Sequence, residues 1–421
     1  MTISIRSAIS LFLISALSFS PATKALTVEE KLRLVVEVYE LKNDLCEVDQ
    51  TLLDKQKAQI GEVLFETPVL SGNYDTSCRK CHLEEHTLTD GLPMAVGVGG
   101  EGQSTERLHS DGVVVPRNAF TLFGRGNKHF NVFFWDGKVQ AQDGQIYSPI
   151  GEGYSKGFQS PLSVAAVLPL LARDEFLGKQ STTESTLHLD LINSSYYAAK
   201  IEAANSVLQS ILEDKNNEFA QKLRLALENQ QVEARQFTLP FVGNSLASFI
   251  AQEISECPET AWGNYLDGDK DALDQSQKQG AVIFFGKGRC AACHSGSNFT
   301  DLDFHSIGVP QGNLGPHIHG QDIGRAGVTF KTEDRYKFRT PSLLLVSKTP
   351  PYGHNGEFKT LDEVIRFHIN PIPFFAQKGW NSDRELLTYG KILGSRSDLL
   401  KYIDVSSQKE VEQLVDFLNT L

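Results

Sequence analysis

The chain contains the two stretches Cys78-Arg-Lys-Cys81-His82 and Cys290-Ala-Ala-Cys293-His294, and these decide how the rest of it is interpreted. A Cys-x-x-Cys-His segment is the attachment site of a c-type haem. Its thiols bind the porphyrin covalently, and its histidine supplies the proximal nitrogen to iron. Paired cysteines also occur in zinc sites and redox dithiols, but zinc prefers four closed ligands and no second cysteine pair lies near either stretch. The sequence therefore predicts two covalently bound c-type haems.

Residues 1–25 have the features of a signal peptide. Arg6 precedes an apolar run from Ile9 to Phe19, and the small residues Thr23 and Ala25 offer a cleavage point, with cleavage after Ala22 as an alternative. The run is shorter than the roughly 20 apolar residues that a membrane-spanning helix needs, so we expect no membrane span. Bacterial c-type haem is attached in the periplasm. The signal peptide and the haem motifs therefore predict the same location.

The pattern along the rest of the chain predicts helices. The segments Thr27-x-x-Glu30 and Ser407-x-x-Glu410 are capping boxes, and each precedes apolar residues spaced along one helix face. Glycine-rich stretches at 91–126 and 286–327 follow or enclose the haem motifs and predict long irregular loops around the cofactors. The chain is longer than one typical domain, which favours two domains. We expect an all-α fold with a first haem domain at 26–255 and a second at 256–421.

The net charge of the chain restricts the molecules that it is expected to bind. The formal net charge is −12, and removal of Arg6 and Lys24 with the signal peptide changes it to −14. Nucleic acid is therefore not expected to bind, whereas a basic donor protein fits.

Outside the haem motifs the cysteines are Cys46 and Cys257. An oxidising compartment would allow them to pair, and the sequence leaves both the paired and the free state open.

Five further segments surround the two haem motifs in a recognisable order. They are Gly61-Glu-Val-Leu-Phe65, Phe134-Trp-Asp-Gly137, Asp301-Leu-Asp-Phe-His305, Phe338-Arg-Thr-Pro341 and Pro351-Tyr-Gly-His354. Together they resemble the bacterial dihaem cytochrome c peroxidase family. The stretches 304–309 and 352–356 are most similar to its MauG-like branch, whose members oxidise residues of partner proteins. The resemblance implies two cytochrome c-like haem domains, hydrogen peroxide as oxidant, and a redox partner protein: a cytochrome c, a cupredoxin or a protein substrate.

The resemblance assigns peroxide chemistry to the first haem. Typical family members have a histidine sixteen residues after the proximal histidine, which blocks the iron until the other haem is reduced. Val98 occupies this position here. A valine cannot bind iron, so the resemblance implies a haem that is already open to peroxide. His86 and His109 remain alternative ligands.

The family moves the peroxide proton with a glutamate and a glutamine. Gln145 lies ten residues after Trp135, as in the family, and Glu175 matches the catalytic glutamate, with Glu152 as its competitor. The alternative for either glutamate is a solvent-exposed carboxylate with no catalytic role. Trp135 matches the family tryptophan that relays electrons between the haems, and a buried structural role is compatible with this.

The second haem is predicted to have two histidine ligands. Typical peroxidases place a methionine fourteen residues after the histidine of Pro-Tyr-x-His, and the MauG branch places a tyrosine there. Fourteen residues after His354 is His368. Thr360-x-x-Glu363 caps the helix that carries it, and its spacing from Leu361, Val364 and Ile365 turns it inward. Such a histidine can also be an ordinary core residue. After the signal peptide the one methionine is Met94, so methionine ligation is not expected.

A calcium ion between the haems is a further family feature. Asn118, Thr349 and Pro351 match its ligand positions, and oxygen donors suit this hard cation. Structural roles in loops are the alternative for all three. His354 matches a histidine that the family places near this interface, where it would support the ligands rather than bind iron.

These predictions combine into one function with two alternatives. We expect a periplasmic haem peroxidase-type oxidoreductase that reacts with hydrogen peroxide at the His82 haem and takes electrons through the His294 and His368 haem. Val98 and the missing methionine favour MauG-like oxidation of a partner protein. A cytochrome c peroxidase that detoxifies peroxide with a small redox-protein donor is the alternative. A non-catalytic dihaem electron carrier is a further one.

Overall fold

The computed structural model describes residues 25–44, 47–151, 155–178, 197–254, 258–312, 314–317, 320–379 and 382–421. Residues 1–24 of the predicted signal peptide lie outside these ranges. So do Cys46, Cys257 and Glu152, so their predicted roles stay predictions. In the part of the chain that is described, no helix is long and apolar enough to span a bilayer.

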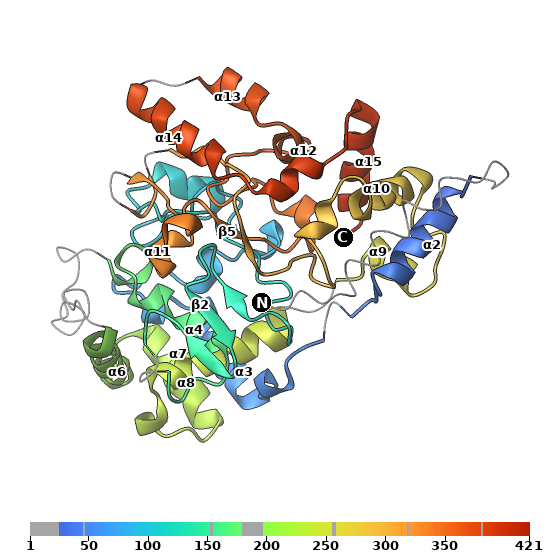
Figure 1. Cartoon of the computed structure of the whole chain (residues 1–421). Helices are drawn as coiled ribbons and strands as arrows, with labels where there is room; N and C mark the ends of the chain where they lie inside the picture. Colours follow the sequence, from blue (N-terminus) through green and yellow to red (C-terminus); the bar gives the residue numbers. More distant parts are fainter. Residues whose placement is uncertain are drawn as a thin grey trace.

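The fold is helical, as predicted, with long loops between the helices (Figure 1). The α-helices are α2 (Val28–Val38), α3 (Lys55–Glu66), α4 (Pro161–Val167), α6 (Tyr197–Glu213), α7 (Glu218–Asn229), α8 (Leu239–Phe249), α9 (Ala261–Leu266), α10 (Gln275–Phe285), α11 (Ala326–Thr329), α12 (Leu361–Ile369), α13 (Ile372–Lys378), α14 (Asp383–Gly394) and α15 (Gln408–Leu418). The three predicted capping boxes are present at Thr27, Thr360 and Ser407, where each hydroxyl accepts from the backbone N–H three residues later.

Two hydrophobic cores carry the two haem motifs, and each is built around a glycine where two helices cross. In the first core α3 packs on α8, and a Cβ at Gly61 would lie 2.1 Å from the Ser245 carbonyl oxygen. In the second core α10 packs on α15, and a Cβ at Gly280 would lie 1.9 Å from the Gln413 carbonyl oxygen. The helices approach this closely because neither glycine carries a side chain.

Helix α2 packs in the second core, although the sequence analysis assigned residues 26–255 to the first domain. Its Leu32 is fully buried there, and the Tyr39 hydroxyl beyond its end donates to the Phe285 carbonyl at 2.8 Å. Figure 1 shows α2 beside α10, far from the helices of the first core. The apolar face of α2 was visible in the sequence, but its partner lies more than two hundred residues later and no local pattern identifies it.

The described residues also form two small antiparallel sheets that the sequence analysis did not predict. One has the order β1 (Val132–Phe133), β2 (Val139–Gln142) and β3 (Gln145–Tyr147), and the other pairs β4 (Phe304–His305) with β5 (Phe338–Arg339). Between β2 and β3, Asp143 and Gly144 have φ of 52° and 77°. These angles suit the two-residue hairpin turn that an Asp-Gly pair favours.

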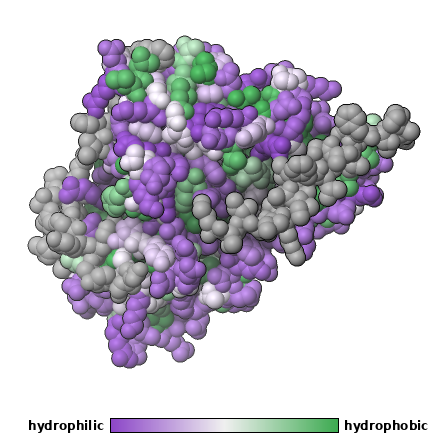
Figure 2. All heavy atoms as spheres, viewed as in Figure 1, coloured by the Kyte–Doolittle hydropathy of each residue, from purple (hydrophilic) through white to green (hydrophobic). Residues whose placement is uncertain are grey.

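Most of the face shown in Figure 2 is hydrophilic. Its clearest apolar group lies at the top of the view, where Figure 1 places α13 and α14. Exposed apolar side chains on these helices include Ile372 and Leu387. The first cysteine of each haem motif is partly buried and packs against its core, Cys78 against the first and Cys290 against the second.

Candidate functional site

The first haem motif folds into a tight turn whose side chains line an internal cavity. The turn begins at the 3-10 segment Cys78–Lys80, and the N–H groups of Cys81 and His82 both donate to the Cys78 carbonyl at 3.1 Å. Both thiols are free, and burial raises the pKa of each to about 12. The cavity beside them has a volume of about 340 Å³.

His82 presents one nitrogen to this cavity. Its Nδ1 lies 2.9 Å from the Leu88 carbonyl oxygen, and since a carbonyl only accepts, Nδ1 carries the proton. Burial lowers the pKa of His82 to about 4, so the ring is neutral and Nε2 keeps its lone pair. A neutral imidazole whose second nitrogen is tied to a carbonyl is the usual form of a metal-binding histidine.

The second motif repeats this arrangement. The N–H groups of Cys293 and His294 donate to the Cys290 carbonyl at 3.2 and 2.9 Å, and His294 Nδ1 lies 3.1 Å from the Phe299 carbonyl oxygen. Burial raises the pKa of Cys290 to about 12 and lowers the pKa of His294. These side chains line a second cavity of about 240 Å³. Free buried thiols and neutral imidazoles beside a cavity fit a c-type haem at both motifs.

His368 lines the same cavity as His294. It lies on α12, and its Nδ1 is 2.7 Å from the Val364 carbonyl oxygen one turn earlier, which leaves Nε2 free. Burial lowers the pKa of His368 to about 4, and the charge that His294 would carry lowers it further. The second cavity therefore holds two neutral imidazoles that are tied in the same way.

Glu175 and Lys138 line the cavity of the first motif. Glu175 lies on a π-helical turn, Arg173–Leu177, a geometry that often occurs at functional sites. Burial raises its pKa, and the positive charge of Lys138 acts in the opposite direction. The Lys138 ammonium lies 4.1 Å from the centre of the Phe134 ring. Lys138 was missed in the sequence, although it directly follows Phe134-Trp-Asp-Gly137.

Gln145 does not line the cavity that holds Glu175. It is the first residue of β3, its side chain is exposed, and its Oε1 accepts from the Tyr147 hydroxyl at 3.1 Å. The hairpin at Asp143 and Gly144 turns the chain back and leaves β3 at the edge of its sheet. Counting ten residues from Trp135 does not account for this turn, so the structure does not bring Gln145 and Glu175 together, and the catalytic role of Gln145 stays a prediction.

The loop that carries Val98 is held by a buried arginine. The Arg107 guanidinium donates to the carbonyls of Val96, Gly97 and Gly100, and Arg107 is only 1% exposed. Gly97 lines the first cavity, and Val98 beside it is buried. A Cβ at Gly97 would lie 1.9 Å from the Asp174 carbonyl oxygen, so this loop packs directly on the turn of Glu175.

The histidines proposed as alternative ligands do not line the first cavity. His86 packs on Gly91, and His109 is exposed. Among the described residues, the cavity wall holds His82 and one further histidine, His317, from the other half of the chain. The ring of His317 accepts from the Ile323 N–H at 3.3 Å, and its Nε2 lies against Gly327. No sequence pattern pointed to it.

Trp135 lines both cavities. Its side chain is 8% exposed, and its indole N–H donates to the Asn118 carbonyl at 2.9 Å. The indole meets the ring of His354 edge-on, with 6.5 Å between the ring centres. His354 is buried, stacks on Phe338 at 3.7 Å, and lines the second cavity. Neither of its ring nitrogens has a hydrogen-bond partner among the described residues.

The predicted calcium ligands lie on one wall of the second cavity. Asn118 contacts two backbone carbonyls through its side-chain amide, that of Leu92 at 2.7 Å and that of Pro351 at 3.4 Å. The Thr349 hydroxyl donates to the Val346 carbonyl at 3.2 Å. The structure brings Asn118 and Pro351 together, and the role of the three residues in binding calcium stays a prediction.

Comparisons with known proteins agree with this architecture. Residues 55–271 match the family model described as di-haem cytochrome c peroxidase. The chain is 28% identical over 373 residues to the methylamine utilization protein MauG of Methylorubrum extorquens, covering 88% of this chain and 79% of that protein. It is 25% identical over 389 residues to cytochrome-c peroxidase IdrP1 of Pseudomonas sp. strain SCT, covering 87% and 80%.

The fold also matches a solved structure, a MauG-like protein associated with microbial copper homeostasis. The TM-score is 0.57 with 21% sequence identity, over 88% of this chain and 90% of that one. The family implies two c-type haems, and its named relatives are haem oxidoreductases. This chain belongs to the di-haem cytochrome c peroxidase family.

Proposed function

We propose that this protein is a periplasmic enzyme that reacts with hydrogen peroxide at the first haem and oxidises a partner protein through the second, as MauG-like proteins do. The observation that supports this is the difference between the two cavities. Glu175 and Lys138 line the cavity of the first motif, whereas the cavity of the second motif is lined by His368 as well as His294. One haem site is suited to an oxidant and the other to electron transfer.

The haems supply the iron at which peroxide reacts and the capacity to store and pass electrons. In the first cavity His82 would hold the iron through Nε2, and Val98 stands where typical family members have a histidine that could bind it. Glu175 is the group that moves a proton between the two peroxide oxygens. Its raised pKa lets the carboxylate hold that proton, and the Lys138 ammonium limits the rise. Lys138 also offers a positive charge to the oxygen that leaves.

In the second cavity His294 and His368 would bind the iron from both sides through Nε2. Two imidazoles close the site to peroxide and stabilise the ferric state relative to a methionine ligand. Trp135 lies in the wall of both cavities and is the residue through which electrons would pass. We extend the proposal to calcium, held by Asn118, Thr349 and Pro351.

A detoxifying cytochrome c peroxidase is the second candidate. The relatives divide between cytochrome c peroxidases and MauG, with identities of 25% and 28%, so similarity does not choose between them. The two functions differ in the reductant, which is a small redox protein in one and an amino-acid residue of a protein in the other. Val98 and His368, which replace residues of typical peroxidases, favour the MauG-like function.

The test is a titration of the purified dihaem protein with stoichiometric hydrogen peroxide, followed by absorption and EPR spectroscopy. We expect the high-spin signal of one haem to react without prior reduction. If both haems are low-spin and inert, the protein is an electron carrier and the proposal fails. Steady-state turnover with reduced cytochrome c then separates the two enzymatic functions, because rapid turnover identifies a detoxifying peroxidase.

A further inference from the structure

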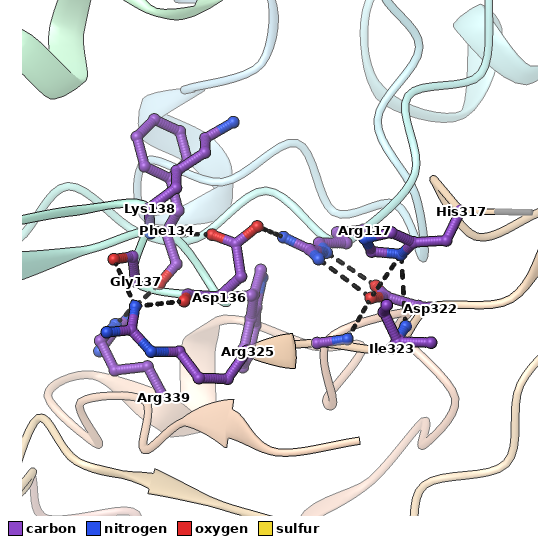
Figure 3. A network of polar contacts seen from close by, with 12 residues as sticks. Arg117, Phe134, Asp136, Gly137, Lys138, His317, Asp322, Ile323, Arg325 and Arg339 are labelled. Atoms are coloured by element: carbon purple, nitrogen blue, oxygen red, sulfur yellow. Dashed lines mark hydrogen bonds and ion pairs between the residues drawn. The ribbon is translucent and has the colours of Figure 1, made fainter. Parts of the chain in front are cut away.

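The short segment that carries Trp135 is held by two arginines of the second half of the chain. The Trp135 carbonyl accepts from the Arg339 N–H at 2.8 Å, and the Phe134 carbonyl accepts from Arg339 Nε at 3.2 Å. The next two carbonyls, those of Asp136 and Gly137, both accept from Arg325 Nη1, at 2.9 and 2.8 Å. Four consecutive carbonyls are therefore bound by Arg325 and Arg339. Figure 3 shows Phe134, Asp136 and Gly137 beside the two arginines.

A chain of ion pairs fixes the same segment from its other side. The Asp136 carboxylate accepts from Arg117 Nη1 at 2.6 Å, and Arg117 binds Asp322 with two bonds, of 2.7 and 3.0 Å. Burial would raise the pKa of Asp322, but the hydrogen bonds from Arg117 outweigh it and lower the pKa to about 2. Figure 3 shows Arg117 between the two carboxylates. Asp322 lies in the second half of the chain, so this pairing also crosses between the two cores.

Packing leaves the segment no room to shift. Gly137 has φ of +65°, and a Cβ there would lie 2.2 Å from Phe304 Cζ and 2.9 Å from Arg325 Nη1. The Arg325 guanidinium itself lies over the Phe304 ring, 4.2 Å from its centre. Its remaining nitrogen, Nη2, donates to the Gln140 side chain at 3.1 Å. The Phe304 ring and the Gln140 side chain therefore hold the Arg325 guanidinium in addition to the two carbonyls that it binds.

We infer that Arg325 and Arg339 are positioning residues for electron transfer between the haems. They bind the backbone on both sides of the Trp135 side chain, which lines both cavities. The bonds that dock the two halves of the chain therefore also set the electron path. One electron passes from the second cavity to the first through Trp135, and no bond forms or breaks. This inference rests on the proposed function and adds the residues that hold its path.

The experiment compares Arg325→Gln with the control Arg335→Gln in the dihaem protein. Arg335 lies in the same region, but its guanidinium bonds only the neighbouring Tyr336 hydroxyl at 3.4 Å among the described residues. One electron is injected by pulse radiolysis, and its redistribution between the haems is followed by absorption. Hydrogen exchange of the peptides containing Gly137 and Arg339 is measured in parallel, because it reports the anchoring of the segment without any haem reaction.

We expect Arg325→Gln to slow the redistribution several-fold, because without the two bonds from Arg325 to the Asp136 and Gly137 carbonyls the segment that carries Trp135 can shift away from its place between the cavities. Exchange at Gly137 should become faster. Arg335→Gln should change neither quantity. Faster exchange with an unchanged transfer rate would overturn the inference, and so would equal effects of both variants.

If Arg325→Gln does not fold, Arg325→Lys replaces it, since lysine keeps the charge but lacks the planar fork. Its transfer rate should be lower than that of wild type and its exchange at Gly137 faster, and a wild-type rate with faster exchange would again overturn the inference. The pulse experiment uses no peroxide. A protein inert to peroxide therefore contradicts the proposed function alone, whereas an unchanged transfer rate contradicts this inference alone.

Discussion

The two haem cavities share one construction and differ in the other side chains that line them. In each, the backbone of the Cys-x-x-Cys-His turn hydrogen-bonds to the carbonyl of its first cysteine. The Nδ1–H of the histidine donates a hydrogen bond to a further backbone carbonyl. The first cavity then presents Glu175 and Lys138, and the second presents His368. The Cys-x-x-Cys-His turn therefore fixes which cofactor is held, and the remaining side chains that line the cavity fix what that cofactor can do.

The largest effect is expected from Glu175→Gln, which removes the feature specific to the first cavity. The amide cannot accept the peroxide proton, so the second-order rate constant with hydrogen peroxide should fall about 10²- to 10⁴-fold. Stopped-flow absorption measures it. Glu101→Gln is the matched control, because this exposed glutamate does not line the cavity. A comparable loss in Glu152→Gln instead would transfer the role to the competing glutamate.

His368→Ala should remove the feature specific to the second cavity. With one imidazole gone, the low-spin EPR signal of one haem should become high-spin, and that haem should begin to bind peroxide. His368→Met should keep the low-spin state and raise the reduction potential by a measurable part of the range of about 0.8 V that axial ligands span. An unchanged EPR spectrum in His368→Ala would remove the assignment of His368 as a ligand.

The pH dependence of the peroxide reaction tests the electrostatics of the first cavity. Because burial raises the pKa of Glu175, the carboxylate should become protonated, and the rate should fall, at a higher pH than for an exposed glutamate. Lys138 lowers that pKa, so Lys138→Met should move the fall in rate to still higher pH. Lys128→Met, which alters an exposed lysine paired with Glu47, should leave the profile in place. A profile that is identical in Lys138→Met would contradict this reading.

The smallest effect is expected from Thr360→Ala, which removes the cap of the helix that holds His368. Loss of the cap should lower the free energy of unfolding by about 1 kcal/mol. Ser407→Ala removes an equivalent cap on α15 and should cost a similar amount. In thermal melts, the low-spin haem band should start to disappear at a lower temperature in Thr360→Ala than in wild type, and Ser407→Ala should not show this change. If the band is lost at the same temperature in both variants, the stability of α12 alone does not decide whether His368 stays bound.

Local patterns predicted the helices, their caps and the haem turns, because each depends on residues a few positions apart. His368 is an example, since its cap and helical spacing placed it inward and the structure has it on the cavity wall. Contacts between distant segments were not predictable in this way. Neither the packing of α2 on the second core nor His317 in the first cavity follows from any local spacing. The spacing of Gln145 from Trp135 could not show that a hairpin at Asp143 and Gly144 turns the chain back between them.

The position of α2 has a consequence for the order in which the protein assembles. The second core needs Leu32 from near the start of the described chain and Leu418 from near its end, so it closes only after the whole chain has emerged. The first core lies between these two segments and can close earlier. We therefore expect the Cys290 turn to stay accessible to the attachment machinery after the Cys78 turn has been enclosed. The second haem could then be attached later than the first.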